Sequence, residues 1–349
     1  MRNEILWKKI VIFRQSRIGD ALVTFPLIEA LKHSYPGAEL WYCTQKFANN
    51  AHLQGYQVVG MSPHIKNIVT YEFNSNPVNK FFELKSKLKI GRNDLLIYLP
   101  YSKVSKVQII RDWLIFRFLG YRHTACFKEN WRWTHIYKKA DTKFPKESER
   151  MINFVLSSGI SLKYDCEYSL LYDKEFADRA WDKWGLNDKK VLAICPGSRM
   201  QSKRWPKEKY IELGKEWHKK TGMHIVLVGG LNEAELANEV LTHWKGYGYT
   251  ACGVELTQTA GILSKTLAYC GNDTGCMHLA SLLKIPCVAL FSARESKELW
   301  HPMGNNNVVL RKRVECENCG LENCSYGIPK CLEKICVEEV ITALGKVCI

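Results

Sequence analysis

Short apolar runs alternate along the chain with stretches of helical periodicity. The runs at 10–13, 191–195 and 287–291 are apolar throughout, which is typical of strands buried on both faces of a parallel sheet. A helical pattern follows the first run from Ala21 to Leu31, and another covers about 207–220 after the second. This alternation predicts parallel sheets with helices on both faces.

The alternation begins twice. Lys8-Lys9 and Lys189-Lys190 each precede an apolar strand that leads into a loop with Ser and Arg and then into a helical pattern. A length of 349 residues suits two domains. We therefore predict an α/β protein with two doubly wound domains at 1–165 and 170–325, followed by a Cys-containing helical tail at 326–349.

Composition excludes some classes of protein. With 46% hydrophobic and 24% charged residues, the chain is globular rather than disordered. No apolar run approaches the roughly 20 residues that cross a bilayer. The N-terminal residues predict a strand and not a signal peptide, because two lysines interrupt their apolar stretch. We therefore expect a cytoplasmic protein.

The net charge of +15 is concentrated in the first half, where residues 77–150 alone hold 17 basic and 7 acidic residues. This asymmetry indicates an anionic partner, either nucleic acid, a phospholipid surface or an acidic substrate. The same region is rich in aromatic residues, and its segment 107–119 is either a membrane-surface helix or a core helix that ends at Gly120. Burial is the favoured alternative, since most of the helix is apolar.

Three loops carry candidate chemistry, and each follows a predicted strand. The first is Ser16-Arg17-Ile18-Gly19-Asp20, which should lie in a cleft because ligands bind beyond the carboxyl ends of parallel strands. Gly19 permits close approach of the backbone to a ligand. Asp20 is either the N-cap of the next helix or a general base, and its position alone favours the cap.

The second and third loops have the residue types that bind phosphate. In the second, backbone amides, Ser198 and Lys203 suit phosphate oxygens, although an ordinary Pro-Gly turn is the alternative. In the third, Asp273 or Thr274 would cap a helix, and His278 lies four residues after Thr274 on the same helical face. A phosphate at this N-terminus would meet amides, hydroxyl and imidazole together, whereas the alternative is a lone buried histidine.

Together these segments, at 14–20, 196–206 and 272–280, resemble glycosyltransferase family 9, the bacterial heptosyltransferases, in motif order and spacing. The likeness extends over nearly the whole chain and is greatest to heptosyltransferase II. It implies the GT-B fold, in which two Rossmann-like domains face a central cleft. It also implies an inverting transfer of heptose from ADP-heptose to the inner core of lipopolysaccharide. No Asp-x-Asp pair is present, and no cofactor or metal is expected.

The resemblance also implies roles for individual residues. Asp20 would be the general base that deprotonates the acceptor hydroxyl, which reverses the preference for a cap, with Ser16, Arg17 and Gly19 on the acceptor side. Arg199 stands where the family often has a second Ser/Thr hydroxyl, and Glu233 would contact the ribose. The implied donor-binding residues are Ser198, Arg199, Lys203, Glu233, Asp273, Thr274, Gly275 and His278.

Six of the 14 cysteines lie in the last 34 residues. Clustered cysteines in a cytosolic protein favour zinc or iron over disulfides. The gaps in Cys316-x2-Cys319-x4-Cys324-x6-Cys331 do not match a zinc ribbon, however. We expect reduced thiols that pack structurally, with these four residues as the candidate metal ligands.

The sequence thus predicts a heptosyltransferase at the cytoplasmic face of the inner membrane of a Gram-negative bacterium, in peripheral contact with anionic lipid. One alternative is a family 9 enzyme with another nucleotide sugar or with a protein or capsule acceptor. A basic nucleic-acid-binding protein is the alternative from another class. No nucleic-acid partner is expected, because no recognition motif is visible and the charge avoids one whole domain.

Overall fold

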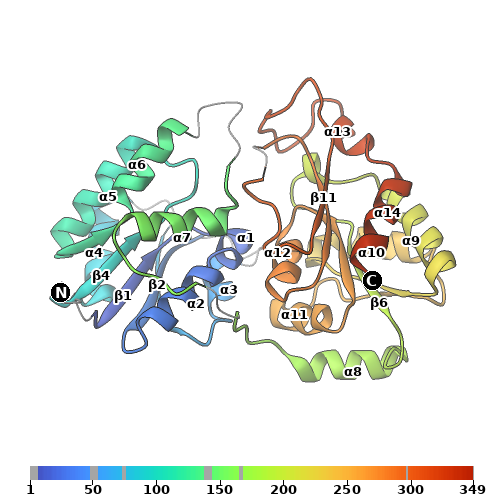
Figure 1. Cartoon of the computed structure of the whole chain (residues 1–349), viewed down its shortest axis with the longest axis horizontal. Helices are drawn as coiled ribbons and strands as arrows, with labels where there is room; N and C mark the ends of the chain where they lie inside the picture. The colour runs from blue at the N-terminus through green and yellow to red at the C-terminus, as the bar shows by residue number, and fades with distance from the viewer. Residues whose placement is uncertain are drawn as a thin grey trace. The chain divides into compact units, whose positions relative to one another are not determined.

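The computed structural model describes residues 7–47, 54–72, 76–136, 144–164, 168–295 and 298–348. The chain divides into two compact units, Met1–Leu171 and Tyr172–Ile349. Each unit contains a parallel β-sheet packed with helices (Figure 1).

In the first unit, the strand order is β3-β2-β1-β4-β5, and neighbouring strands are parallel. The strand order reverses between β1 and β4, and ligands of open α/β sheets bind at such a switch point. The strands are β1 (Lys9–Phe13), β2 (Glu39–Lys46), β3 (Ile65–Glu72), β4 (Asp94–Tyr98) and β5 (His123–Ala125). The helices are α1 (Ile18–Leu22), α2 (Phe25–Ser34), α3 (Gly55–Val59), α4 (Pro77–Leu88), α5 (Lys106–Leu119), α6 (Phe127–Ile136) and α7 (Glu147–Ser157).

In the second unit, the order β11-β10-β9-β6-β7-β8 places the switch point between β6 and β9. The strands are β6 (Val191–Cys195), β7 (His224–Leu227), β8 (Gly248–Thr250), β9 (Ala268–Asn272), β10 (Cys287–Phe291) and β11 (Val308–Arg311). The helices are α8 (Lys174–Trp184), α9 (Lys207–Thr221), α10 (Ala234–Leu241), α11 (Leu256–Ser264), α12 (Gly275–Leu282), α13 (Lys330–Glu333) and α14 (Val337–Val347), with short 3-10 turns η1 (Gln201–Lys203) and η2 (Leu231–Glu233).

The continuous apolar runs are the central strands of both sheets. Every residue of β1, β6 and β10 is buried, as expected for strands covered on both faces. The single helix predicted from Ala21 to Leu31 is wrong, because α1 ends at Leu22 and α2 begins at Phe25. Pro26 lies in the first turn of α2, where its missing N–H costs nothing, but it could not continue a helix from α1.

The C-terminal segment is part of the second unit. Leu332, Ile335, Val340 and Leu344 belong to the same buried cluster as the β6 residues. In addition, the indole Nε1 of Trp205 donates to the Ile335 carbonyl at 3.1 Å. Core residues between Cys331 and Leu344, within the segment expected as a Cys-containing helical tail, therefore help to complete the core of this unit.

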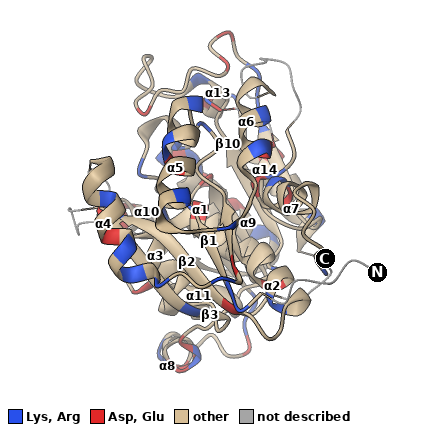
Figure 2. Cartoon of the chain, turned by 90° about the vertical axis from the view of Figure 1, so that its left-hand side faces the viewer, with Lys and Arg blue, Asp and Glu red and all other residues tan. Residues whose placement is uncertain are grey.

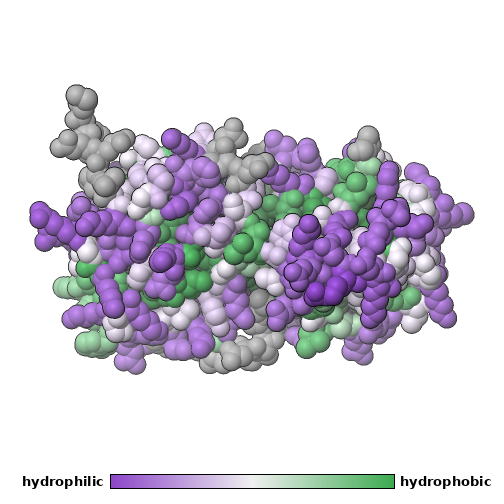
Figure 3. Space-filling view, turned by 90° about the horizontal axis from the view of Figure 1, so that it is seen from below, coloured by the Kyte–Doolittle hydropathy of each residue, from purple (hydrophilic) through white to green (hydrophobic). Residues whose placement is uncertain are grey.

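Helix α5 is buried on one face only. Ile109, Ile115 and Phe116 pack into the core, and Gly120 ends the helix at a φ of 106°. Val107 and Phe118, however, are each 76% exposed, so the expectation of a core helix holds only for the inner face. Within the described ranges, no helix is long and apolar enough to cross a membrane. Polar side chains predominate on the face seen in Figure 3, with apolar areas between them.

Candidate active-site residues

The loop after β1 is organised around a buried arginine. Arg14 donates from Nε to the Asp20 carbonyl and from Nη2 to Glu147 Oε1, both at 3.0 Å. Glu147, on α7, also accepts two hydrogen bonds from Arg150. The two arginines outweigh the effect of burial, which would raise the pKa of Glu147, and lower it instead. Arg14 thereby fixes the loop to the body of the unit.

Asp20 lies in the first turn of α1, where its side chain is 22% exposed. The N-cap position belongs to Arg17, so Asp20 as N-cap is wrong. The carboxylate instead reaches back, and its Oδ2 accepts from the Arg17 N–H at 3.3 Å. Burial raises the pKa of Asp20, although Arg14, 3.6 Å away, opposes this effect. A partly exposed carboxylate with a raised pKa is chemically suited to accept a proton.

The acceptor-side residues differ in accessibility. Ser16 is buried, and its hydroxyl lies 3.0 Å from that of Thr44 on β2. A Cβ at Gly55 would meet Ser16 at 2.4 Å, so α3 packs directly on this serine. Arg17 is exposed and Gly19 is half-buried. Ser16 is therefore a supporting residue in this structure, whereas Arg17, Gly19 and Asp20 reach solvent.

Asn272 joins the loops of the second unit. Its side-chain amide donates to the carbonyls of Pro196 and Gly197 at 2.9 and 3.1 Å. Its Oδ1 accepts from the Trp205 N–H at 3.1 Å and from the Tyr210 hydroxyl at 3.0 Å. One buried side chain at the end of β9 thus holds the loop after β6 and the start of α9 in place.

Lys203, Asp273 and His278 form a cluster at the switch point. Lys203 Nζ lies 2.5 Å from Asp273 Oδ2, and His278 Nε2 lies 4.0 Å from Asp273 Oδ1. His278 is 2% exposed, and its Nδ1 has no hydrogen-bond partner in the described part of the chain. Burial lowers the pKa of His278 to about 4, and Lys203 adds to this effect while Asp273 opposes it. The imidazole is therefore neutral near pH 7, and its Nδ1 is a buried polar atom that makes no hydrogen bond within the described residues.

The turn before α12 contains the expected hydroxyl and glycine. Thr274 is the N-cap residue and Gly275 the first helical residue, but the Thr274 side chain makes no capping hydrogen bond. Its Oγ1 lies 3.4 Å from the Tyr269 hydroxyl and 3.8 Å from Cys195 Sγ. The first amides of α12 are therefore not capped by this side chain.

Glu233 meets the same loops through two glycines. A Cβ at Gly197 would lie 2.5 Å from the Glu233 carboxyl carbon, and one at Gly229 would lie 2.7 Å from Oε2. Burial raises the pKa of this carboxyl, whereas the Gly230 N–H and Arg204 oppose the rise. The two glycines leave the space that the Glu233 side chain occupies.

Ser198 and Arg199 are neighbours in the loop after β6, but their side chains have different surroundings. Ser198 is buried, and its carbonyl accepts from Arg204 Nε at 2.7 Å. The Arg199 side chain is 46% exposed and lies 3.5 Å from Glu322. Ser198 is therefore a buried loop residue bonded to Arg204, whereas Arg199 pairs with Glu322.

Three site residues were missed in the sequence. Arg14 and Asn272 lie inside the motifs that the sequence singled out. Arg14 directly follows the buried strand β1, and Asn272 is the last residue of the buried strand β9, so a polar residue at these positions was the available signal. Glu147 had no such signal, since it follows no predicted strand and pairs with Arg14 across 133 positions of sequence.

The C-terminal cysteines are free thiols in this structure. Cys331 is buried, Cys319 is exposed, and Cys316 and Cys324 are half-buried. Across the described ranges, no three or more His, Cys, Asp or Glu side chains are arranged to hold a metal ion.

Two doubly wound units, each with polar side chains gathered where the strand order reverses, are typical of enzymes with the GT-B fold. The chain belongs to glycosyltransferase family 9 (heptosyltransferase), whose family profile matches residues 85–328.

Individual relatives agree with this assignment. The chain is 22% identical to lipopolysaccharide heptosyltransferase 2 of Escherichia coli over 87% of its length and 88% of that relative. The solved structure of E. coli ADP-heptose lps heptosyltransferase II matches with a TM-score of 0.69 at 21% identity, over 97% of this chain and 98% of that one. The solved structure of a family 9 glycosyltransferase from Veillonella parvula matches with a TM-score of 0.74 at 21% identity. The match covers 99% of this chain and 98% of that one. The predicted family and GT-B fold are confirmed.

Proposed function

We propose that the protein transfers heptose from ADP-heptose to the inner core of lipopolysaccharide, with inversion and with Asp20 as the general base. The proposal includes a place at the cytoplasmic face of the inner membrane and chemistry that needs no metal. The observation that carries its donor half is the cluster of Lys203, Asp273 and His278 at the β6/β9 switch point. Relatives named as lipopolysaccharide heptosyltransferases support the sugar and the acceptor.

The donor-side residues have the chemistry that a leaving diphosphate requires. Lys203 supplies positive charge, and the amides that begin α12 supply donors at the positive end of a helix dipole. Neutral His278 adds a hydrogen bond without a second cation. Together they would stabilise the negative charge that develops on ADP as its bond to the sugar breaks.

On the acceptor side, Asp20 takes up the proton that the acceptor hydroxyl loses. The acceptor hydroxyl transfers its proton to the Asp20 carboxylate as its oxygen attacks the anomeric carbon. The new C–O bond forms on the face opposite the diphosphate, and the electron pair of the breaking bond leaves with ADP. The raised pKa of Asp20 favours this proton transfer.

The donor assignment is tested by nucleotide-induced thermal stabilisation. We expect ADP to raise the melting temperature of the protein, and UDP and GDP to have little effect, because a ligand that binds the folded state stabilises it more when it binds more tightly. Stabilisation by UDP but not ADP would refute ADP-heptose as donor. Mass analysis of truncated lipopolysaccharide after incubation with ADP-heptose then tests the acceptor, and a product with no added heptose would contradict it.

His278→Ala should weaken ADP-heptose binding about tenfold or more, because a hydrogen bond to a charged phosphate is lost. Calorimetric titration measures the dissociation constant, and the exposed His243→Ala is the matched control. Since the pKa of His278 is about 4, its charge state stays constant between about pH 6 and about pH 8. A wild-type affinity that falls across this range, and no longer falls in H278A, would show that His278 binds as a cation.

A further inference from the structure

Helices α4 and α5 present apolar side chains to solvent. We call these side chains the apolar docking surface, and α4 packs beside α5 in the first unit. Exposed apolar side chains that gather on one surface often mark an interaction site. The apolar docking surface consists of Val78 and Phe82 on α4 and Val107, Ile110, Trp113, Leu114 and Phe118 on α5.

The exposed side chains of α5 follow a helical stripe. Val107, Ile110, Leu114 and Phe118 are spaced by three or four residues and share the outer face. The inner face is formed by Ile109, Asp112, Ile115 and Phe116, all of which are buried. An apolar stripe along one face of a helix normally packs against another apolar surface. The outer face of α5 therefore has the character of an interface.

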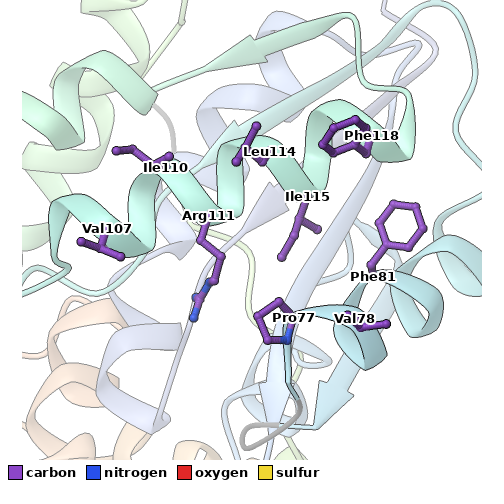
Figure 4. A pocket seen from close by; sticks show the side chains of 9 residues that line it. All are labelled: Pro77, Val78, Phe81, Val107, Ile110, Arg111, Leu114, Ile115 and Phe118. Atoms are coloured by element: carbon purple, nitrogen blue, oxygen red, sulfur yellow. The ribbon is translucent and has the colours of Figure 1, made fainter.

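A shallow groove of about 690 Å³ runs between the two helices. Figure 4 shows Arg111 and Ile115 extending from α5 toward Pro77 of α4, with Phe81 and Phe118 farther along. Apart from Arg111, the lining is apolar, and the Arg111 guanidinium is held by Asp112 at 2.9 Å. The groove is thus an apolar depression with a cation at its side.

The surrounding charge is almost entirely positive. The acidic residues between 76 and 136 are Glu83, Asp94, Asp112 and Glu129, of which the last three are buried and Glu83 pairs with Lys87. Figure 2 shows basic positions along α4, α5 and α6. Between residues 76 and 136, the exposed basic side chains are those of Lys85, Lys87, Lys89, Arg92, Lys103, Arg117, Arg122, Lys128 and Arg132.

Aromatic and basic side chains also pair at this surface. Lys106 Nζ lies 4.8 Å from the ring centre of Trp131 on α6, and Lys85 Nζ lies 5.8 Å from that of Phe81. Trp113 and Trp131 are both partly exposed. Tryptophan rings and snorkelling Lys and Arg side chains suit the boundary between acyl chains and headgroups.

We propose that the apolar docking surface inserts into the headgroup region of a bilayer that contains anionic phospholipid. The apolar stripe enters the acyl boundary, and the surrounding lysines and arginines contact lipid phosphates. A second copy of this chain fits less well, because like charges would face each other around the patch. The inference rests on the proposed function for its purpose, since a lipid-linked acceptor is presented at such a surface.

The test is vesicle co-sedimentation of the full chain with phosphatidylcholine vesicles, with and without phosphatidylglycerol. We expect the wild type to bind vesicles with phosphatidylglycerol far better than those without. The double variant V107S/F118S should bind them about tenfold or more weakly, because two exposed apolar side chains no longer enter the bilayer. Arg117→Gln should reduce binding about fivefold on the anionic vesicles alone.

Leu171→Ser is the matched control, since Leu171 is an exposed apolar residue of the same unit outside the patch. Unchanged vesicle binding by V107S/F118S, an equal loss in L171S, or no wild-type binding at all would overturn the proposal. A wild-type dimer that V107S/F118S dissociates, without vesicle binding, would assign the patch to self-association instead. ADP-induced stabilisation of each variant is measured in parallel. If ADP does not stabilise the wild type, the proposed donor is contradicted, but the result on vesicle binding remains valid.

Discussion

Asp20→Asn is expected to lower the rate of sugar transfer by about 100-fold or more and to leave ADP binding unchanged. General-base catalysis contributes roughly 10² to 10⁴ in rate, and an amide cannot take up the acceptor proton. The amide oxygen can still accept from the Arg17 N–H, as Oδ2 does at 3.3 Å. Arg14 keeps its hydrogen bond to Glu147, so the loop after β1 should stay in place.

Steady-state transfer and the ADP-induced melting shift together check this prediction. Glu39→Gln is the matched control, because Glu39 is an exposed carboxylate at the start of β2. As the pKa of Asp20 is raised, activity should fall with acidity at a pH above the ordinary aspartate value of about 4. Near-normal turnover of D20N would restrict Asp20 to its hydrogen bond with Arg17.

Glu147→Ala is expected to lower the free energy of unfolding by about 3–5 kcal/mol, which is the usual cost of removing one partner of a buried ion pair. Glu147 is fully buried between Arg14 and Arg150, and its Oε1 lies 3.0 and 2.6 Å from their guanidinium nitrogens. Removing the carboxylate leaves two buried cations without this partner. The loop that bears Asp20 should loosen as well, so transfer should also fall.

Urea unfolding measures the change, with Glu149→Ala as the control on the same helix. Glu149 is exposed, and its Oε2 accepts from the Lys146 N–H, so its loss should cost less than about 1 kcal/mol. The folded-state pKa of Glu147 is lowered. Its stabilisation is therefore complete above the unfolded value of about 4.3 and declines as the pH falls through the folded value. Equal stability of the two variants would contradict this role of Glu147.

Local sequence was enough to predict much of the fold and the placement of the three loops. Strands 191–195 and 287–291 match β6 and β10 residue for residue, because a strand buried on both faces must be apolar throughout. Lys203, Asp273 and His278 were found because parallel strands bring their carboxyl ends to one edge of the sheet.

The remaining features depend on contacts that local sequence does not encode. Glu147 reaches Arg14 only after the unit has folded. Periodicity alone could not show that α1 and α2 are separate helices, since apolar spacing continues across the break at Val23 and Thr24. The outer face of α5 has the same residue types as its inner face. Only the fold decides which of them meets solvent.

The place of α14 in the second unit has a consequence for biosynthesis. Ile335, Val340 and Leu344 share a core with β6, which is made more than a hundred residues earlier in the chain. The first unit can therefore fold during translation, as domains generally do. The second must wait with its central strand incompletely covered until α14 emerges from the ribosome. Until α14 is made, this incompletely covered core is open to chaperones and proteases.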